Sequence, residues 1–233
     1  MLFRVLMIAL ALGGSSASAA LAADAPPAPP DGTYSYSIDR ASANIGTSTV
    51  TVKRSGDAIM VHETQAMPAQ KFAVTVDETL AGSQLAPKSY VGNYTMEGGT
   101  PVVVRMSFNG SRADATVDGA SGSTSLKLPP RITSGYVIEG ALLTGFLFLP
   151  AQLHASRATA FAGIVPSKLT QVTNTVDRGM RPVRPPGAPA NDIAVSIRGP
   201  VDFQEWYDPT TFVLDAVSVP SQNVLIHLTK RSG

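Results

Sequence analysis

Histidine is the side chain in this sequence best suited to metal binding or to acid–base chemistry at neutral pH, and the chain has three: His62, His154 and His227. A metal site needs ligands that converge, often paired at i, i+2 or i, i+4. No histidine has another histidine or a cysteine at that spacing. His62 and Glu63 are neighbours in an expected strand, so their side chains point to opposite faces. We therefore expect structural histidines, no metal site and no cofactor.

Nucleophilic catalysis would need a more complete motif than the sequence offers. A serine hydrolase places its nucleophile in a G-x-S-x-G turn, and residues 119–123 (GASGS) miss that pattern by one position. Asp118-Gly119 lacks the Ser or Thr of an aspartic-protease loop. We expect the protein not to be an enzyme. The enzymatic alternative requires at least two of five side chains to converge within hydrogen-bond reach: Asp118, His62, His154, His227 and Glu205.

Three arginines recur every third residue in the Pro-rich segment 178–191: Arg178, Arg181 and Arg184. In polyproline II geometry this spacing aligns them on one edge, where they would meet an acidic partner or a lipid headgroup. The alternative is a solvated loop, because four prolines and two glycines exclude a regular element.

An aromatic strand is expected at residues 201–207. Phe203 and Tyr207 share one face of it, and Trp206 lies on the other. Trp206 either belongs to the core or lines a concave ligand surface. Leu142, Phe146, Trp206 and Tyr207 are the candidates for contact with an apolar ligand.

The most apolar segment after the N-terminus, residues 137–153, is the element around which the rest is expected to fold. Ile138, Leu142, Phe146, Leu149 and Leu153 recur at three- and four-residue spacing, which indicates a helix. Ser134 would cap the helix and Pro150 would end it, so we expect it over about residues 137–149. A strand with two apolar faces is the alternative.

Alternating apolar and polar residues predict short strands on both sides of this segment. Tyr34, Tyr36 and Ile38 share one face, and Val50 and Val52 share another. Asn109-Gly110 predicts a hairpin turn between two such strands. Turns every ~10–15 residues indicate a meander rather than βαβ units. The expected fold is mainly β: an open antiparallel β-sheet, or half-barrel, wrapped around one short helix, in a single domain over residues 33–230.

Residues 1–22 have the pattern of a secretory signal peptide, with Arg4, an apolar run over residues 5–12, and Ala20-Leu21-Ala22 as a cleavage site. The Pro-rich residues 23–32 are expected to be a disordered leader. Cleavage removes one arginine and leaves 17 basic and 17 acidic residues, a balance that argues against nucleic acid as partner. The chain has no cysteine for a lipid anchor. We expect a periplasmic or secreted protein that does not span a membrane.

Several segments resemble uncharacterised secreted bacterial families of unknown function over most of residues 33–230. The resemblance rests on the aromatic strand of residues 203–214 with its Asp208-Pro209 turn, and on Val219-Pro220, Tyr34-Ser35-Tyr36, Ile45-Gly46-Thr47 and residues 85–90 (LAPKSY). It implies an open half-barrel around a helix, similar to the periplasmic lipoprotein carriers that shield acyl chains. It implies no catalytic residues.

Two functions remain open from the sequence. In the first, the protein binds an apolar or lipid-like molecule on the concave face of its sheet. In the second, the core is filled and the protein meets a partner through an edge strand or through the Arg-Pro loop 178–191.

Overall fold

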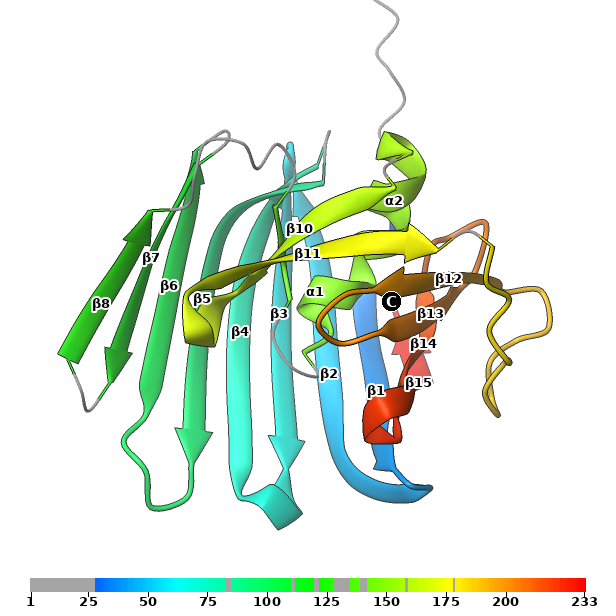
Figure 1. Cartoon of the computed structure of the whole chain (residues 1–233), viewed down its shortest axis with the longest axis horizontal. Helices are drawn as coiled ribbons and strands as arrows, with labels where there is room; N and C mark the ends of the chain where they lie inside the picture. Colours follow the sequence, from blue (N-terminus) through cyan, green and yellow to red (C-terminus); the bar gives the residue numbers. More distant parts are fainter. Residues whose placement is uncertain are drawn as a thin grey trace, which may run out of the picture.

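In the computed structural model, the described residues are 28–82, 85–109, 112–119, 122–127, 135–138, 142–157, 159–177 and 179–233. The expected signal peptide and the first residues of the expected leader lie outside this part. Within it, fifteen strands form one sheet (Figure 1). The strands are β1 (Gly32–Arg40), β2 (Ala43–Ser55), β3 (Ala58–Met67), β4 (Phe72–Ala81), β5 (Ala86–Met96), β6 (Val102–Asn109), β7 (Arg112–Gly119), β8 (Gly122–Lys127), β9 (Gly135–Val137), β10 (Ala160–Val165), β11 (Thr170–Asp177), β12 (Ile193–Arg198), β13 (Phe203–Tyr207), β14 (Leu214–Val219) and β15 (Val224–Ser232).

The sheet consists of two meanders, β1–β8 and β9–β15, that lie side by side. Its order is β8-β7-β6-β5-β4-β3-β2-β1-β15-β14-β13-β12-β11-β10-β9. The first strand therefore pairs with the last, with Thr33 opposite Ser232 and Arg40 opposite Val224. The pairs are antiparallel except β9 with β10, which is parallel. The sheet is open, with β8 and β9 as its two edges, and the predicted antiparallel half-barrel is confirmed.

The sheet curls so that its last strands cover the inner face of its first half. Figure 1 shows β10 and β11 crossing in front of the long central strands. One hydrophobic cluster joins Val137 of β9 and Ile164 of β10 to Val76, Tyr90 and Val104 of β4, β5 and β6. Burial of these apolar faces stabilises the curled shape of the sheet.

The helical segment lies within this curve, later in the chain than expected. It consists of α1 (Thr144–Leu147) and α2 (Leu149–Ser156). The expected helix over residues 137–149 is wrong in its limits, because Val137 belongs to β9 and the helix starts at Thr144. Pro150 does not end it but occupies the first turn of α2, where proline's missing N–H costs nothing. Residues 139–141 and Ser134, the expected cap, lie outside the described residues.

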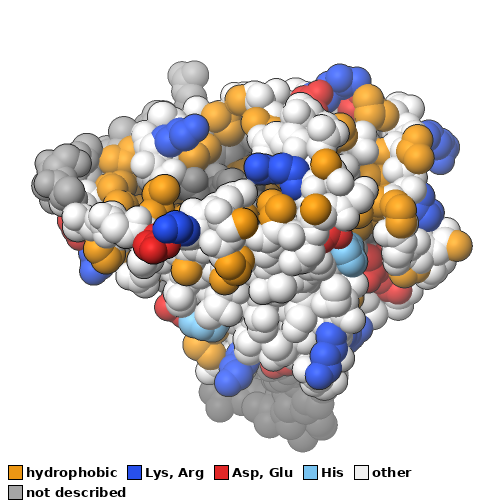
Figure 2. Space-filling view, turned by 90° about the horizontal axis from the view of Figure 1, so that it is seen from below, with side chains coloured by type: hydrophobic (Ala, Val, Ile, Leu, Met, Phe, Trp, Pro, Cys, Tyr) orange, Lys and Arg blue, Asp and Glu red, His pale blue; other side chains and the backbone are white. Residues whose placement is uncertain are grey.

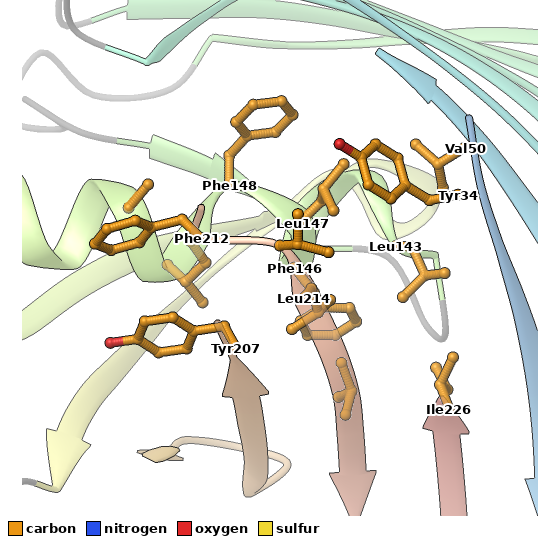
Figure 3. Close-up of a cluster of buried hydrophobic side chains, with 14 of the residues drawn as sticks. Tyr34, Val50, Leu143, Phe146, Leu147, Phe148, Tyr207, Phe212, Leu214 and Ile226 are labelled. Atoms are coloured by element: carbon orange, nitrogen blue, oxygen red, sulfur yellow. The ribbon is translucent and has the colours of Figure 1, made fainter. Parts of the chain in front are cut away.

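Burial of the helix side chains builds the main core (Figure 3). Leu143, Phe146 and Leu147 pack with Tyr34 and Val50 of the first meander, and with Leu214 and Ile226 of the second. Phe146 meets the ring of Phe203 edge-on, with centroids 5.0 Å apart. Gly145 allows the backbone of β9 to approach, since a Cβ there would collide with the Val137 carbonyl. The glycine that counts against a helix in the sequence is thus required by packing.

The strand predictions agree with the structure in most places. Tyr34, Tyr36 and Ile38 are buried together, as are Val50 and Val52. Asn109 pairs with Arg112, which confirms the predicted hairpin, although residues 110 and 111 lie outside the described chain. The end of the expected leader is docked on the sheet, because Tyr34 donates a hydrogen bond of 2.7 Å to the Pro30 carbonyl.

Candidate functional site

Three hairpins of the sheet share one kind of connection. Each turn is a short 3₁₀ helix that begins with proline: η1 (Pro68–Gln70), η2 (Pro166–Lys168) and η3 (Pro220–Gln222). The proline sets φ for the turn and has no N–H to satisfy. The next residue is left-handed in all three and donates its N–H back to the proline carbonyl, at 2.9 to 3.1 Å. These residues are Lys71, Leu169 and Asn223.

The three turns line one cleft at the end of the half-barrel. This turn cleft has a volume of about 470 Å³, and its walls include Met67 and Gln70, Val165 and Lys168, and Val219 and Gln222 from the three turns. Its apolar lining includes Ile38, Ile45, Ile138, Phe146, Val201 and Phe203. Figure 2 shows a hollow on this face bordered by hydrophobic side chains, with a basic side chain beside it. The cleft is therefore apolar inside and open at the surface.

A second hollow of about 410 Å³ lies on the other side of the first turn. Met67 lines both spaces, and Ser167, the neighbour of Lys168, lines the second. Phe72, Tyr94, Met96, Val102 and Leu142 provide its apolar walls. Met96 is 61% exposed at its edge.

The polar groups of the turn cleft are basic or neutral. Arg40, at the end of β1, and Lys168, in η2, line it, and no Asp or Glu is among its described lining residues. Asn174, in β11, also lines it and is 2% exposed. The electrostatic character of the cleft is thus positive.

The four predicted ligand-binding residues do not lie together in the structure. Phe146 lines the turn cleft and Leu142 lines the second hollow. Trp206 is 1% exposed and Tyr207 is stacked on Phe212 with centroids 5.4 Å apart; neither lines these two spaces. Sequence reasoning missed Arg40, Lys168 and Asn174.

One sequence signal for the cleft was available. A hydrophobic residue, proline and a small residue recur as Met67-Pro68-Ala69, Val165-Pro166-Ser167 and Val219-Pro220-Ser221. Each triplet stands between two alternating runs, where a turn is expected. The repeat identifies three like hairpins, although it does not place them together in space.

The arginines of the Pro-rich loop have unlike positions. Arg181 is exposed, while Arg184 braces its own loop by donating hydrogen bonds to the carbonyls of Pro189 and Asp192. Arg178 lies outside the described residues. Residues 179–191 contain no strand or helix, as expected, and Val183 is 90% exposed there.

Buried carboxyl groups form a second set of unusual residues beneath the helix. Glu63 of β3 accepts hydrogen bonds from the Leu143 and Thr144 amides, at 3.0 and 2.8 Å, and from the Ser48 hydroxyl at 2.7 Å. Burial raises the pKa of Glu63 despite these bonds. Burial, and then the charge of Glu63, raises the pKa of Glu78 to about 8. The cavity beside Glu78 has a volume of about 10 Å³, room for about one water molecule.

Two further carboxyl sites lie in the second meander. Glu205 is fully buried, and burial raises its pKa well above the usual range. Burial, followed by the charges of Asp192 and Asp208, raises the pKa of Asp215 to about 7. These groups favour the protonated form in the folded protein.

Of the five side chains considered for catalysis, the three histidines and Asp118 each contact a different residue, and the carboxyl oxygens of Glu205 have no hydrogen-bond partner among the described residues. His62 pairs with Asp77 at 2.7 Å, His227 lies 3.5 Å from Asp39, and Asp118 pairs with Arg105 at 2.6 Å. His154 packs edge-on against Phe212. Across the described ranges, no three His, Asp or Glu side chains gather in a way that could hold a metal ion. No described helix is long and apolar enough to cross a membrane.

Comparisons with known proteins identify the fold. No family model matches the chain, and no curated protein matches its sequence. A solved structure, that of a beta-barrel-like protein of the domain of unknown function DUF1849 from Brucella abortus, is similar, with a TM-score of 0.51 and 9% identity. The similarity covers 88% of this chain and 98% of that one. It confirms the expected resemblance: the chain has the barrel-like fold of an uncharacterised domain of unknown function.

Proposed function

We propose that the protein is a non-catalytic binding module that holds an apolar, acyl-type ligand in the turn cleft. The volume of this cleft, about 470 Å³, is the observation that carries the proposal. It falls in the range of small-molecule sites, roughly 300–1,000 Å³. Such sites are mostly apolar with a few placed polar groups, as this one is.

The position of the helix explains why an open site remains in a well-packed protein. α1 and α2 fill the middle of the concave face, and residues 142–153 are buried throughout. The cleft lies beyond this packed region, where Phe146 and Phe203 reach its wall from the core. Val201, 43% exposed, stands at the opening. A ligand that covered these side chains would gain roughly 25 cal/mol per Å² of apolar surface removed from water.

Blocking the cleft tests the proposal. We expect purified protein to raise the fluorescence of the neutral probe N-phenyl-1-naphthylamine, and dodecanol to displace it. Val201→Trp should weaken probe binding by about tenfold or more, because the indole would occupy the cleft. Val183→Trp, at a 90% exposed position outside the cleft, is the matched control and should leave binding unchanged.

Equal binding by the two variants, or no binding by the unchanged protein, would contradict this function. The interaction hypothesis would then stand in its place. Its own test is a pull-down in which residues 178–191 are replaced by a Gly-Ser segment, with loss of a partner as the expected result.

We propose a periplasmic or secreted location for this module, on the strength of Arg4, the apolar run at residues 5–12 and Ala20-Leu21-Ala22. Expression in a bacterial host, fractionation and intact-mass measurement check it. The expected mass is that of a chain beginning at Ala23 or Asp24. A full-length product in the cytoplasmic fraction would contradict it.

A further inference from the structure

Two cations of the turn cleft have no acidic counterpart there. Arg40 and Lys168 come from different hairpins, β1–β2 and β10–β11, and both line the cleft. Neither forms an ion pair with a described residue, whereas Arg54, Lys71, Arg105 and Arg198 each pair with an acid elsewhere on the surface. Positive groups beside low-dielectric walls concentrate the field and attract anions.

Asn174 provides an independent sign of a missing partner. Its side chain is buried in the same cleft, and its amide nitrogen has no hydrogen-bond partner. A buried amide N–H without an acceptor is costly, by about the desolvation of the group, and such groups are rare in folded proteins. An oxygen atom of a ligand in the cleft would satisfy it.

The surrounding backbone is built to admit this amide. A Cβ at Gly163 would lie 2.8 Å from the Asn174 nitrogen, and a Cβ at Gly199 would collide with its side-chain oxygen. Glycine on both sides therefore leaves the room that the amide group occupies. Gly163 lies in β10 and Gly199 directly follows β12, so the amide lies between the backbones of these two segments.

We propose that Arg40, Lys168 and Asn174 form a subsite for the anionic headgroup, a carboxylate or a phosphate, of an amphiphile whose chain lies on the apolar lining. This inference rests on the proposed function and names its ligand class. Arginine and lysine attract the negative charge, and the Asn174 amide donates to one of its oxygens. The apolar wall of Phe146 and Phe203 accepts the chain.

Ligands with one chain and different headgroups test the subsite. Dodecanoate, dodecyl phosphate and dodecanol each displace the neutral probe at pH 8, in low salt. We expect the two anions to bind about tenfold more tightly than the alcohol, and the difference to shrink in high salt. The stronger of the two anions identifies the source, a fatty acid or a phospholipid-type headgroup.

The double variant Arg40→Gln, Lys168→Gln should bring the anions within about twofold of dodecanol and leave dodecanol unchanged. Arg181→Gln with Lys88→Gln removes the same two charge types at exposed positions outside the cleft and is the matched control. The control keeps the preference for anions if the effect is local.

Gly199→Ala tests the third residue of the proposed subsite, Asn174. The added Cβ displaces the Asn174 amide, so the preference for anions should fall several-fold with probe binding retained. Thermal melts show whether each variant is folded, and the double glutamine variant does not depend on a buried substitution.

The outcomes separate the two proposals. Equal affinity for dodecanoate, dodecyl phosphate and dodecanol, with Val201→Trp still weakening the binding of all three, would overturn the headgroup subsite and leave the cleft as the binding site. Failure of Val201→Trp to affect dodecanol would overturn the cleft itself.

Discussion

Ionisation of the buried Glu78 side chain should make the stability of the protein depend on pH. Its pKa is raised from 4.5 to about 8 in the folded protein by burial and then by Glu63. Between these values the folded state keeps the proton that the unfolded state has lost. The free energy of unfolding therefore falls as pH rises from about 4.5 to about 8.

Glu78→Gln should flatten this dependence, because the amide stays neutral in both states. We expect the variant to be more stable than the unchanged protein at pH 8, by about 2–4 kcal/mol, and similar to it at pH 4.5. Urea denaturation across this pH range measures it. Glu97→Gln, whose carboxylate pairs with Lys71 on the surface at 2.8 Å, is the control and should change stability by less than about 1 kcal/mol. An unaltered slope in Glu78→Gln would refute the assignment.

The inward direction of the buried Glu78 and Glu205 side chains follows from the alternating pattern of their strands. Glu78 stands between Val76 and Leu80, and Glu205 between Phe203 and Tyr207, at the same two-residue spacing as the apolar residues of their faces. The inward direction of each was therefore predictable. Their environment was not, because it depends on the helix and strands that the chain brings from far away.

The helix depends on a cap that comes from the sheet. Leu143 precedes α1 and offers no side-chain hydrogen bond, so the first amides are satisfied by Glu63, about 80 residues earlier in the chain. Such a carboxylate also lies favourably against the positive end of the helix dipole. The cap fixes where the helix sits in the concave face.

Removal of this cap should loosen the helix. Glu63→Ala leaves the Leu143 and Thr144 amides and the Ser48 hydroxyl buried without an acceptor, so we expect a loss of about 3–5 kcal/mol. Glu63→Gln retains one acceptor oxygen and should lose less. Chemical denaturation gives both values, and hydrogen exchange at residues 143–147 should quicken first in the alanine variant. Equal loss in the two variants would argue against the capping role.

Local sequence patterns predicted that a helix forms in this segment better than they predicted the residues at which it begins and ends. Phe146, Leu149 and Leu153 lie in α1 and α2 and are buried, whereas Leu142 is buried but precedes α1. The error lay in treating Pro150 as a stop, since proline is equally suited to the first turn of a helix. Only the distant Glu63 distinguishes the true start, and no local pattern contains it.

At the scale of the whole molecule, the pairing of β1 with β15, which we call the seam, joins the two meanders. β1 pairs with β15 along its length, and Gly233 comes against Gly32 and Asp31. The alternating runs predicted most of the strands, but they did not predict this order. Pairing of the first strand with the last is set by burial of Tyr36, Ile226 and Leu214 around the helix, which is a property of the assembled core.

Deletion of residues 224–233 should therefore abolish folding, because it removes β15 and splits the sheet. A circular permutant tests whether the seam itself, rather than chain length, is needed. Gly233 joined to Ala28 by a short Gly-Ser linker, with new ends between Val183 and Arg184, should fold, since the old ends are adjacent and Val183 is exposed. Circular dichroism and size-exclusion chromatography check both variants. A folded truncation would show that each meander is stable alone.

The seam also determines when the sheet can be completed during synthesis of the chain. β1 pairs with β2 on one side, and its partner on the other side, β15, is translated nearly two hundred residues later, as the pairing of Tyr34 with Arg231 shows. Until then the nascent chain presents a long unpaired edge, the kind of surface at which chains aggregate. The interval favours recognition by chaperones, and it means that the cleft and its three turns are completed only after the last hairpin has been made.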